Sequence, residues 1–247
     1  MAGGGYRLAM PGPFHRSASV YDVVYTRIDY PGSAAYVERL VRERNPGARS
    51  LLDVACGTGI HLGIWRERFD HVEGVDLDPN MLAVARNRLP GVPLHEVDFL
   101  SFDLGRTFDA VTCMFSSIGY ANTPDRLDGA IATMARHLAP DGVLVVEPWF
   151  RRSAIVPPWV RGMVSETDDV VVTRTSRMVL DGEHQTDMEM AYLVTRPEGS
   201  EFFTERHLMG LYDPERYVAA AEKAGLVAEF DPVGSSLGRG MLIGVKR

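Results

Sequence analysis

The residues best suited by type and spacing to bind a small polar ligand are two acids and two glycines, Asp53, Gly57, Gly59 and Asp76. Glycines allow backbone angles and a close approach to a ligand that a side chain would prevent. Asp76 stands 19 residues after Gly57, which suits a carboxylate that accepts hydrogen bonds from ribose hydroxyls at the neighbouring strand. Leu62 occupies the position of the third glycine of a dinucleotide fingerprint, so the pattern does not predict a dinucleotide.

These residues require strands that end beside one another, and the surrounding sequence predicts such a sheet. Strands and helices alternate from residue 51 to about residue 147, which indicates an α/β fold of the Rossmann-like kind, with a parallel sheet and helices on both faces. The predicted strands are residues 51–54, 72–76, a run ending at 97–99, 108–115 and 142–147. The predicted helices are residues 34–44, 61–69, 79–89 and 124–138. Asp78 and Thr123 are predicted helix caps, each followed by a proline.

The pattern changes after residue 150. Residues 150–168 read as irregular, and three strand-like runs follow between residues 169 and 212, separated by turn residues. A final helix is predicted at 213–224, with closing strands at 226–230 and 240–245. The chain therefore divides into a flexible tail (1–17), a core with an N-terminal lid segment (18–150), an antiparallel insert (151–212) and a closing part of the core (213–247). The insert is expected to cap the substrate or to form a dimer; a solvated decoration is the alternative.

Composition narrows the class of protein. The chain has 247 residues, 45% of them hydrophobic, with a net charge of −7, which gives no indication of a nucleic-acid partner. No apolar run approaches the roughly 20 residues that span a bilayer, and the first residues are too polar for a signal peptide. The two cysteines, Cys56 and Cys113, predict no disulfide framework and favour the cytoplasm. Histidine spacing predicts no metal site, and no G-x-S-x-G motif indicates a serine hydrolase.

Four motifs taken together resemble a known family. They are D-x-A-C-G-T-G from Asp53, G-V-D ending at Asp76, the pair Asp98-Phe99, and F-D-A-V from Phe108. This series is similar to the class I S-adenosylmethionine (SAM)-dependent methyltransferases over roughly residues 35–150. Further stretches resemble the actinobacterial enzymes that dimethylate the amine of a dTDP-linked deoxyamino sugar of the desosamine or mycaminose type, in natural-product biosynthesis. These stretches are residues 113–119, 145–150, 238–240 and Tyr21-Asp22-x-x-Tyr25.

The resemblance implies SAM as cofactor and assigns expected roles around it. Asp76 would accept the ribose hydroxyls, and Asp98 would accept from the adenine amino group. The other expected cofactor contacts are Tyr21, Asp53, Ala55, Gly57, Gly59, Leu77, Met81, Phe99 and Met114. Simpler interpretations stay open: Asp76 and Asp98 as turn or cap residues, and Leu77 and Met81 as ordinary core.

The resemblance also implies an acceptor amine whose attack needs alignment more than a strong base. Tyr25, Tyr120 and Glu147 are the expected catalytic residues, as positioning groups; related enzymes carry a histidine where this chain has Tyr120, and tyrosine is a poor base near pH 7. Arg239, between two glycines, is expected to bind the diphosphate.

The remaining expected substrate contacts are Ser117, Trp149 and Phe150, with Arg151, Arg174 and Arg177 as secondary diphosphate candidates. For these three arginines a solvated surface position is the simpler interpretation. A homodimer is expected. Two other functions stay open: a SAM-dependent methyltransferase for another small-molecule amine or hydroxyl, and a non-enzymatic SAM-binding regulator.

Overall fold

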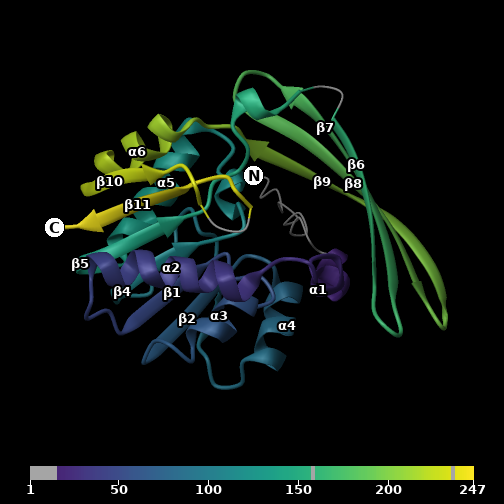
Figure 1. Cartoon of the computed structure of the whole chain (residues 1–247), viewed down its shortest axis with the longest axis horizontal. Coiled ribbons are helices and arrows are strands. Elements are labelled where there is room, and N and C mark those ends of the chain that lie inside the picture. Colours follow the sequence, from purple (N-terminus) through teal and green to yellow (C-terminus); the bar gives the residue numbers. More distant parts are fainter. Residues whose placement is uncertain (1–15, 157–158, 235–236) are drawn as a thin grey trace, which may run out of the picture.

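The computed structural model describes residues 16–156, 159–234 and 237–247, and it consists of two sheets (Figure 1). The predicted flexible tail, residues 1–17, lies outside the described residues except for its last two positions. A seven-stranded sheet forms the body of the molecule, and a four-stranded sheet stands beside it. Within the described part of the chain no helix is long and apolar enough to cross a bilayer.

The seven-stranded sheet has the order β10-β11-β5-β4-β1-β2-β3. Its strands are β1 (Ser50–Val54), β2 (His71–Asp76), β3 (Leu94–Glu96), β4 (Phe108–Cys113), β5 (Leu138–Val146), β10 (Leu226–Asp231) and β11 (Met241–Lys246). The five strands from β3 to β5 are parallel, and β11 pairs antiparallel with both β5 and β10. The prediction of a parallel sheet completed by two closing strands is confirmed. The chain leaves β1 toward β2 on one side and returns to β4 on the other, which opens a crevice at the carboxyl ends of β1 and β4.

Helices cover both faces of this sheet, as the alternating sequence predicts. Figure 1 shows α5 (Pro124–Arg136) and α6 (Pro214–Lys223) on one face, and α2 (Tyr30–Arg44), α3 (Ile60–Trp65) and α4 (Pro79–Arg88) on the other. Asp78 accepts hydrogen bonds from the amides of Asn80 and Met81, and Thr123 accepts one from Arg126, so both predicted caps are confirmed. Helix α2 begins four residues before its predicted start because Asp29 caps it through the amide of Gly32.

The insert is a four-stranded antiparallel sheet in the order β6-β7-β8-β9. Its strands are β6 (Trp159–Glu166), β7 (Val171–Asp181), β8 (Gln185–Arg196) and β9 (Gly199–Gly210). The prediction of an irregular segment through residue 168 was wrong, because residues 159–166 form β6. This strand pairs along its whole length with β7, a long-range contact that its own sequence, interrupted by Gly162, does not signal.

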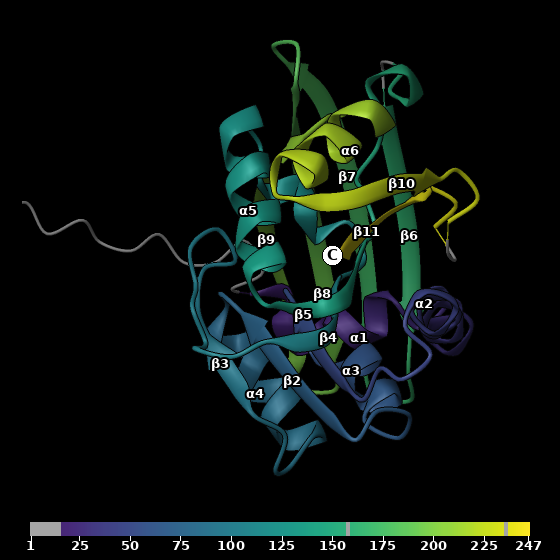
Figure 2. The ribbon, with the colours of Figure 1, turned by 90° about the vertical axis from the view of Figure 1, so that its left-hand side faces the viewer.

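The N-terminal segment lies between the two sheets. It comprises the 3-10 turn η1 (Ser17–Val20) and the short helix α1 (Tyr21–Val24). Val20 and Val24 are buried against the apolar face of the insert. Asp22 accepts a hydrogen bond of 2.7 Å from the Thr58 hydroxyl and pairs with Arg88 of α4. Figure 2, which views the molecule from the side of the core, shows the insert strands behind the core. Through its contacts with Thr58 and with the insert, the N-terminal segment links the crevice to the insert.

Candidate functional site

The glycine loop leaves β1 at the crevice with an unusual backbone. Ala55, Gly57 and Gly59 all have positive φ, of 58°, 57° and 78°. A side chain on Gly57 would meet no atom within 4 Å, whereas one on Gly59 would lie 2.8 Å from Leu89, the residue that follows α4. Gly57 is therefore needed for its backbone angles and leaves open space in front of the loop, and Gly59 is needed for close packing.

Asp76 ties this loop to the tip of β2. Its Oδ2 accepts a hydrogen bond of 2.8 Å from the Gly57 amide, and its Oδ1 accepts one of 2.8 Å from the Asp78 amide. Burial raises the pKa of Asp76, and the two amide donors oppose that rise. Each carboxylate oxygen has a second lone pair, so the side chain can still accept hydrogen bonds from a ligand.

Asp53 lies deeper, on β1, where only 2% of its surface is exposed. Burial raises the pKa of Asp53 to about 7, although the hydroxyl of Thr112 donates a hydrogen bond of 2.9 Å to its Oδ1. This carboxyl group therefore changes its charge near neutral pH. It lines the inner end of the crevice.

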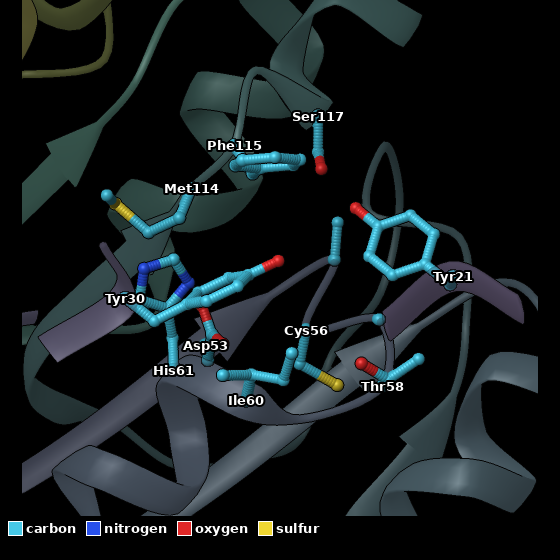
Figure 3. A pocket seen from close by; sticks show the side chains of 12 residues that line it. Tyr21, Tyr30, Asp53, Cys56, Thr58, Ile60, His61, Met114, Phe115 and Ser117 are labelled. Carbon is cyan, nitrogen blue, oxygen red and sulfur yellow. The ribbon is translucent and has the colours of Figure 1, made fainter. Parts of the chain in front are cut away.

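Two hollows, which share Gly57 and Ser117 among their lining residues, open in front of these residues. The smaller, of about 40 Å³, is lined by the glycine loop, Asp53 and Met114 (Figure 3). Figure 3 shows Cys56, Thr58 and Ile60 on one side of it and Phe115 and Ser117 on the opposite side. The larger, of about 810 Å³, extends from Asp76 to the insert. Its volume is at the upper end of the range for small-ligand sites.

Aromatic rings from the N-terminal segment form one wall of these hollows. The ring centroid of Tyr25 lies 4.6 Å from that of Tyr21 and 4.9 Å from that of Phe115. Phe115 and Ser116 both have positive φ, which is strained for residues with side chains. The amide of Phe115 donates a hydrogen bond of 2.8 Å to Glu147, so this buried carboxylate stabilises the strained turn.

Arg239 lies against the two aromatic residues that follow β5. Its guanidinium carbon is 4.6 Å from the ring centroid of Trp149 and 4.1 Å from that of Phe150. Its Nη1 also donates a hydrogen bond of 2.6 Å to the hydroxyl of Ser116. Burial lowers the pKa of Arg239, which stays charged at neutral pH because the group begins from so high a value.

The insert supplies the wall opposite the sheet. Arg174 of β7 donates a hydrogen bond of 2.9 Å to the hydroxyl of Tyr25, and its Nε has no partner among the described residues. His207 of β9 lies 2.8 Å from the hydroxyl of Tyr120. Ser176, Met188 and Met190 line the same wall. None of His207, Ser176, Met188 and Met190 was identified from the sequence, since a strand position reveals its facing only once the strand has partners.

The structure brings most of the predicted site residues together. The larger hollow is lined by Tyr21, Tyr25, Ala55, Gly57, Asp76, Leu77, Met81, Asp98, Phe99, Ser117, Tyr120, Trp149, Phe150 and Arg239, and the smaller one adds Asp53 and Met114. Of the described residues that were predicted, Gly59 and Glu147 line neither hollow.

Two secondary arginine candidates lie elsewhere. Arg177 is opposite Glu189 in the ladder between β7 and β8, three residues from Arg174 and so on the other face of the sheet. Arg151 lies over the ring of Phe230, 5.6 Å from its centroid, and does not line either described hollow. Of the three secondary arginines, therefore, only Arg174 lies at the site.

Three side chains that line the described hollows, Tyr21, Tyr120 and His61, are poorly suited to act as bases at neutral pH. Burial raises the pKa of Tyr21 and of Tyr120 well above the ordinary value. Burial lowers the pKa of His61 to about 4, and its Nε2 lies 3.2 Å from the hydroxyl of Ser33. Among the described residues, no group of three histidine, cysteine or carboxylate side chains is arranged to hold a metal ion. The arrangement is suited to binding and orienting ligands.

Comparison with known proteins places this site in a family. Residues 51–142 match the model of a methyltransferase domain. The chain is 45% identical to dTDP-3-amino-3,6-dideoxy-alpha-D-glucopyranose N,N-dimethyltransferase of Streptomyces fradiae, over 92% of this chain and 90% of that protein. It is 40% identical to dTDP-4-amino-2,3,4,6-tetradeoxy-D-glucose N,N-dimethyltransferase of Saccharopolyspora spinosa, over 93% of this chain and 92% of that protein.

Solved structures agree with the sequence comparison. The crystal structure of Streptomyces venezuelae DesVI is 42% identical and superposes with a TM-score of 0.88, covering 93% of this chain and 98% of that one. SAM-bound CalS10, an amino pentose methyltransferase from Micromonospora echinaspora, is 40% identical, with a TM-score of 0.83 and coverage of 92% and 97%. Because the likeness extends through the core, the insert and the closing strands, the chain is a methyltransferase of the class I fold that belongs to the dTDP-aminosugar N,N-dimethyltransferase family.

Proposed function

We propose that this protein transfers methyl groups from SAM to the exocyclic amine of a dTDP-linked deoxyamino sugar, first one and then a second. The observation that carries the proposal is the single hollow of about 810 Å³ that joins the Asp76 edge of the sheet to the arginines Arg174 and Arg239. A cofactor at one end and a sugar nucleotide at the other would meet near Tyr21, Tyr25 and Tyr120. The near end-to-end similarity to two enzymes of this kind supports it.

SAM is the cofactor, and the residues at the sheet edge fit it. The open space in front of Gly57 allows the methionine part to approach the loop beside Ala55 and Asp53. Asp76 retains lone pairs for the two ribose hydroxyls, and the carboxylate of Asp98 is an acceptor for the adenine amino group. Leu77, Met81 and Phe99 line the larger hollow where the adenine ring would pack, and Met114 lies at the inner end near the methyl group.

In the reaction, a nitrogen–carbon bond forms as the carbon–sulfur bond breaks, and the resulting ammonium loses a proton to water. Bound SAM supplies the methyl group from its sulfonium, and the sulfur is left as a neutral thioether. The chain's own residues therefore act by aligning the amine and excluding water, with Tyr25 and Tyr120 as contacts and Glu147 as support for the Phe115 turn. The insert, residues 151–212, caps the acceptor, and residues 18–29 close over the cofactor through Asp22 and Thr58.

Calorimetry tests the proposed function directly. S-adenosylhomocysteine is titrated into the purified protein, and dTDP is then titrated into that complex; we expect both to bind. Methyl transfer is then assayed with 3-amino and 4-amino dTDP-sugars. Binding of the first ligand alone would refute the sugar-nucleotide assignment and favour another acceptor, and binding of neither would refute the cofactor assignment as well.

Arg239 is proposed to bind the diphosphate, with Ser117, Trp149 and Phe150 around the thymine and sugar. The Arg239→Ala variant is expected to raise the KM for the sugar nucleotide about ten- to a hundredfold, because one charge-assisted contact is worth about 1.5–3 kcal/mol. The affinity for S-adenosylhomocysteine should stay unchanged. Arg151→Ala is the matched control, since Arg151 also stacks on an aromatic ring but lies outside the hollows. An unchanged KM in Arg239→Ala would refute the diphosphate role.

The outer face of the insert supports a homodimer. The ladders align Val164, Thr173, Leu193 and Phe202 in one row across the four strands, and Phe202 is 65% exposed. An exposed apolar row of this kind is typical of an interface. The same face carries charges of both signs, including the pair Arg206–Asp187, which suits two copies related by a twofold axis.

Two free, buried cysteines fit our placement of the enzyme in the cytoplasm.

Sedimentation velocity tests the dimer. The native chain is expected to sediment as a dimer and Phe202→Lys as a monomer, because the lysine replaces the largest and most exposed side chain of the apolar row with a charge. Val227→Lys is the control, since Val227 is 55% exposed but lies on β10, outside the insert. A dimer that persists in Phe202→Lys would place the interface elsewhere, and a monomeric native chain would refute the proposal.

A further inference from the structure

Tyr120 and His207 meet at the wall of the larger hollow although 87 residues separate them in the sequence. Tyr120 ends the 3-10 turn η2 (Ser117–Tyr120) of the core, and His207 lies on β9 of the insert. The Tyr120 hydroxyl is 2.8 Å from Nδ1 of His207, and only 1% of His207 is exposed. The pair therefore joins the two walls of the site where the acceptor would lie.

Glu205 lies behind His207, on the side of the ring nitrogen Nε2. Its Oε2 is 3.9 Å from Nε2 of His207. The Glu205 carboxylate accepts hydrogen bonds from the Arg16 amide at 3.1 Å, the Ser17 amide at 2.9 Å and the Ser17 hydroxyl at 2.7 Å. Three donors suit an ionised carboxylate, and its charge favours a proton on the nearer nitrogen, Nε2.

The direction of the hydrogen bond to Tyr120 follows. With its proton on Nε2, His207 offers Nδ1 as an acceptor, so Tyr120 donates its O–H hydrogen to Nδ1. The phenol oxygen then has only acceptor capacity for a ligand. A neutral amine that attacks a methyl group must point its lone pair at that carbon, and an acceptor for one of its N–H bonds would orient it.

We propose that Glu205 and His207 position Tyr120 so that its phenol oxygen accepts a hydrogen bond from an N–H group of the substrate amine and turns the amine lone pair toward the methyl donor. This inference rests on the proposed function. Tyr120 touches the substrate, and His207 and Glu205 act through it as positioning residues.

The number of N–H bonds gives this arrangement a consequence for the product. A primary amine has two N–H bonds and a monomethylated amine has one, so Tyr120 can orient both for attack. A dimethylated amine has none, so the same contact is lost after the second transfer. The positioning by Tyr120 thus accounts for a reaction that stops at two methyl groups.

The protonation of the pair favours positioning over base catalysis. Burial, together with the positive charge of Arg174, lowers the pKa of His207 to about 4. Burial raises the pKa of Tyr120 well above the ordinary value. Both side chains are therefore neutral at pH 7. In that state Tyr120 donates a hydrogen bond to His207, and neither side chain readily accepts a proton from the amine.

The experiment compares Tyr120→Phe, His207→Leu and the double variant, with kcat measured for the unmethylated and the monomethylated sugar nucleotide. Each single variant is expected to lower both kcat values about ten- to a hundredfold, as for one buried hydrogen bond. The double variant should be no slower than the slower single variant, since both changes remove one contact. His207→Asn, whose amide oxygen can accept from Tyr120, should recover part of the rate. The affinity for S-adenosylhomocysteine should stay unchanged throughout.

His137→Leu is the control for the loss of a buried histidine. His137 bonds the Thr133 carbonyl and the Leu104 amide outside the described lining of the hollows, so this variant should lose stability and keep its kcat. A native kcat in His207→Leu, or multiplicative losses in the double variant, would overturn the inference and leave the proposed function standing. If His207→Leu does not fold, the kcat values of Tyr120→Phe and His207→Asn test the inference instead, and a native kcat in Tyr120→Phe would overturn it. A native enzyme that methylates no dTDP-aminosugar would overturn both.

Discussion

Replacing Asp76 with alanine is expected to weaken the binding of S-adenosylhomocysteine about a thousandfold. The variant loses the proposed acceptor for two ribose hydroxyls, and two hydrogen bonds to a charged group are worth about 4 kcal/mol together. It also releases the Gly57 and Asp78 amides, so the glycine loop loses its tie to β2. Isothermal titration calorimetry measures the effect.

Two further variants separate these contributions. Asp76→Asn keeps the size of the side chain and one acceptor oxygen, so we expect an intermediate loss of affinity. Asp70→Ala removes an exposed carboxylate that pairs only with Arg49 in the described structure, and it should bind like the native chain. An Asp76→Ala variant that binds S-adenosylhomocysteine normally would remove Asp76 from the ribose site.

The second large effect concerns stability and lies three residues earlier on the same strand. Glu73 is fully buried, and its carboxylate bonds His71 at 2.6 Å and His95 at 2.8 Å and pairs with Arg106. Glu73→Gln is expected to lower the free energy of unfolding by about 3 kcal/mol, because it leaves these partners facing a neutral group. Urea denaturation measures it, and Glu67→Gln, at an exposed pair with Arg66, should change stability by less than about 0.5 kcal/mol.

The pH dependence of this effect has a definite sign. Burial acts to raise the pKa of Glu73, but the hydrogen bonds from His71 and His95 and the charge of Arg106 outweigh it, so the pKa is lowered. A lowered pKa stabilises the fold above the ordinary glutamate value, and that stability is lost as the pH falls through the folded-state pKa. The difference between the native chain and Glu73→Gln should therefore be constant near pH 7 and shrink below about pH 4. A difference that grows in acid would contradict this account.

Local signals in the sequence predicted the nucleoside end of the site. Asp53, Gly57 and Asp76 each lie within a few residues of a strand end, and parallel strands present their carboxyl ends at one edge of the sheet. The caps Asp78 and Thr123 were also legible, because a cap bonds amides only two or three residues away. Glu147 shows the limit: its place after β5 was correct, yet its carboxylate faces the Phe115 amide and does not line either described hollow.

Which side chains form the acceptor end of the site depended on pairings between segments that are distant in the sequence. Arg174 and Arg177 lie three residues apart on β7, so they occupy opposite faces, but only the packing of the insert on the N-terminal segment decided that Arg174 faces inward. A shift of one residue in the register would exchange the faces of every side chain on the strand. The strand β6 was missed for the same reason, since its partner β7 defines it.

The sequence by itself therefore determined the family, the cofactor and the edge of the sheet at which we propose that it binds, because these depend on motifs whose residues are close in the chain. The tertiary structure alone decided which insert residues reach the site and that Tyr120 meets His207. Those contacts join distant segments, with 87 residues between Tyr120 and His207 and 149 between Tyr25 and Arg174, and their geometry comes from sheet register and from burial against the core.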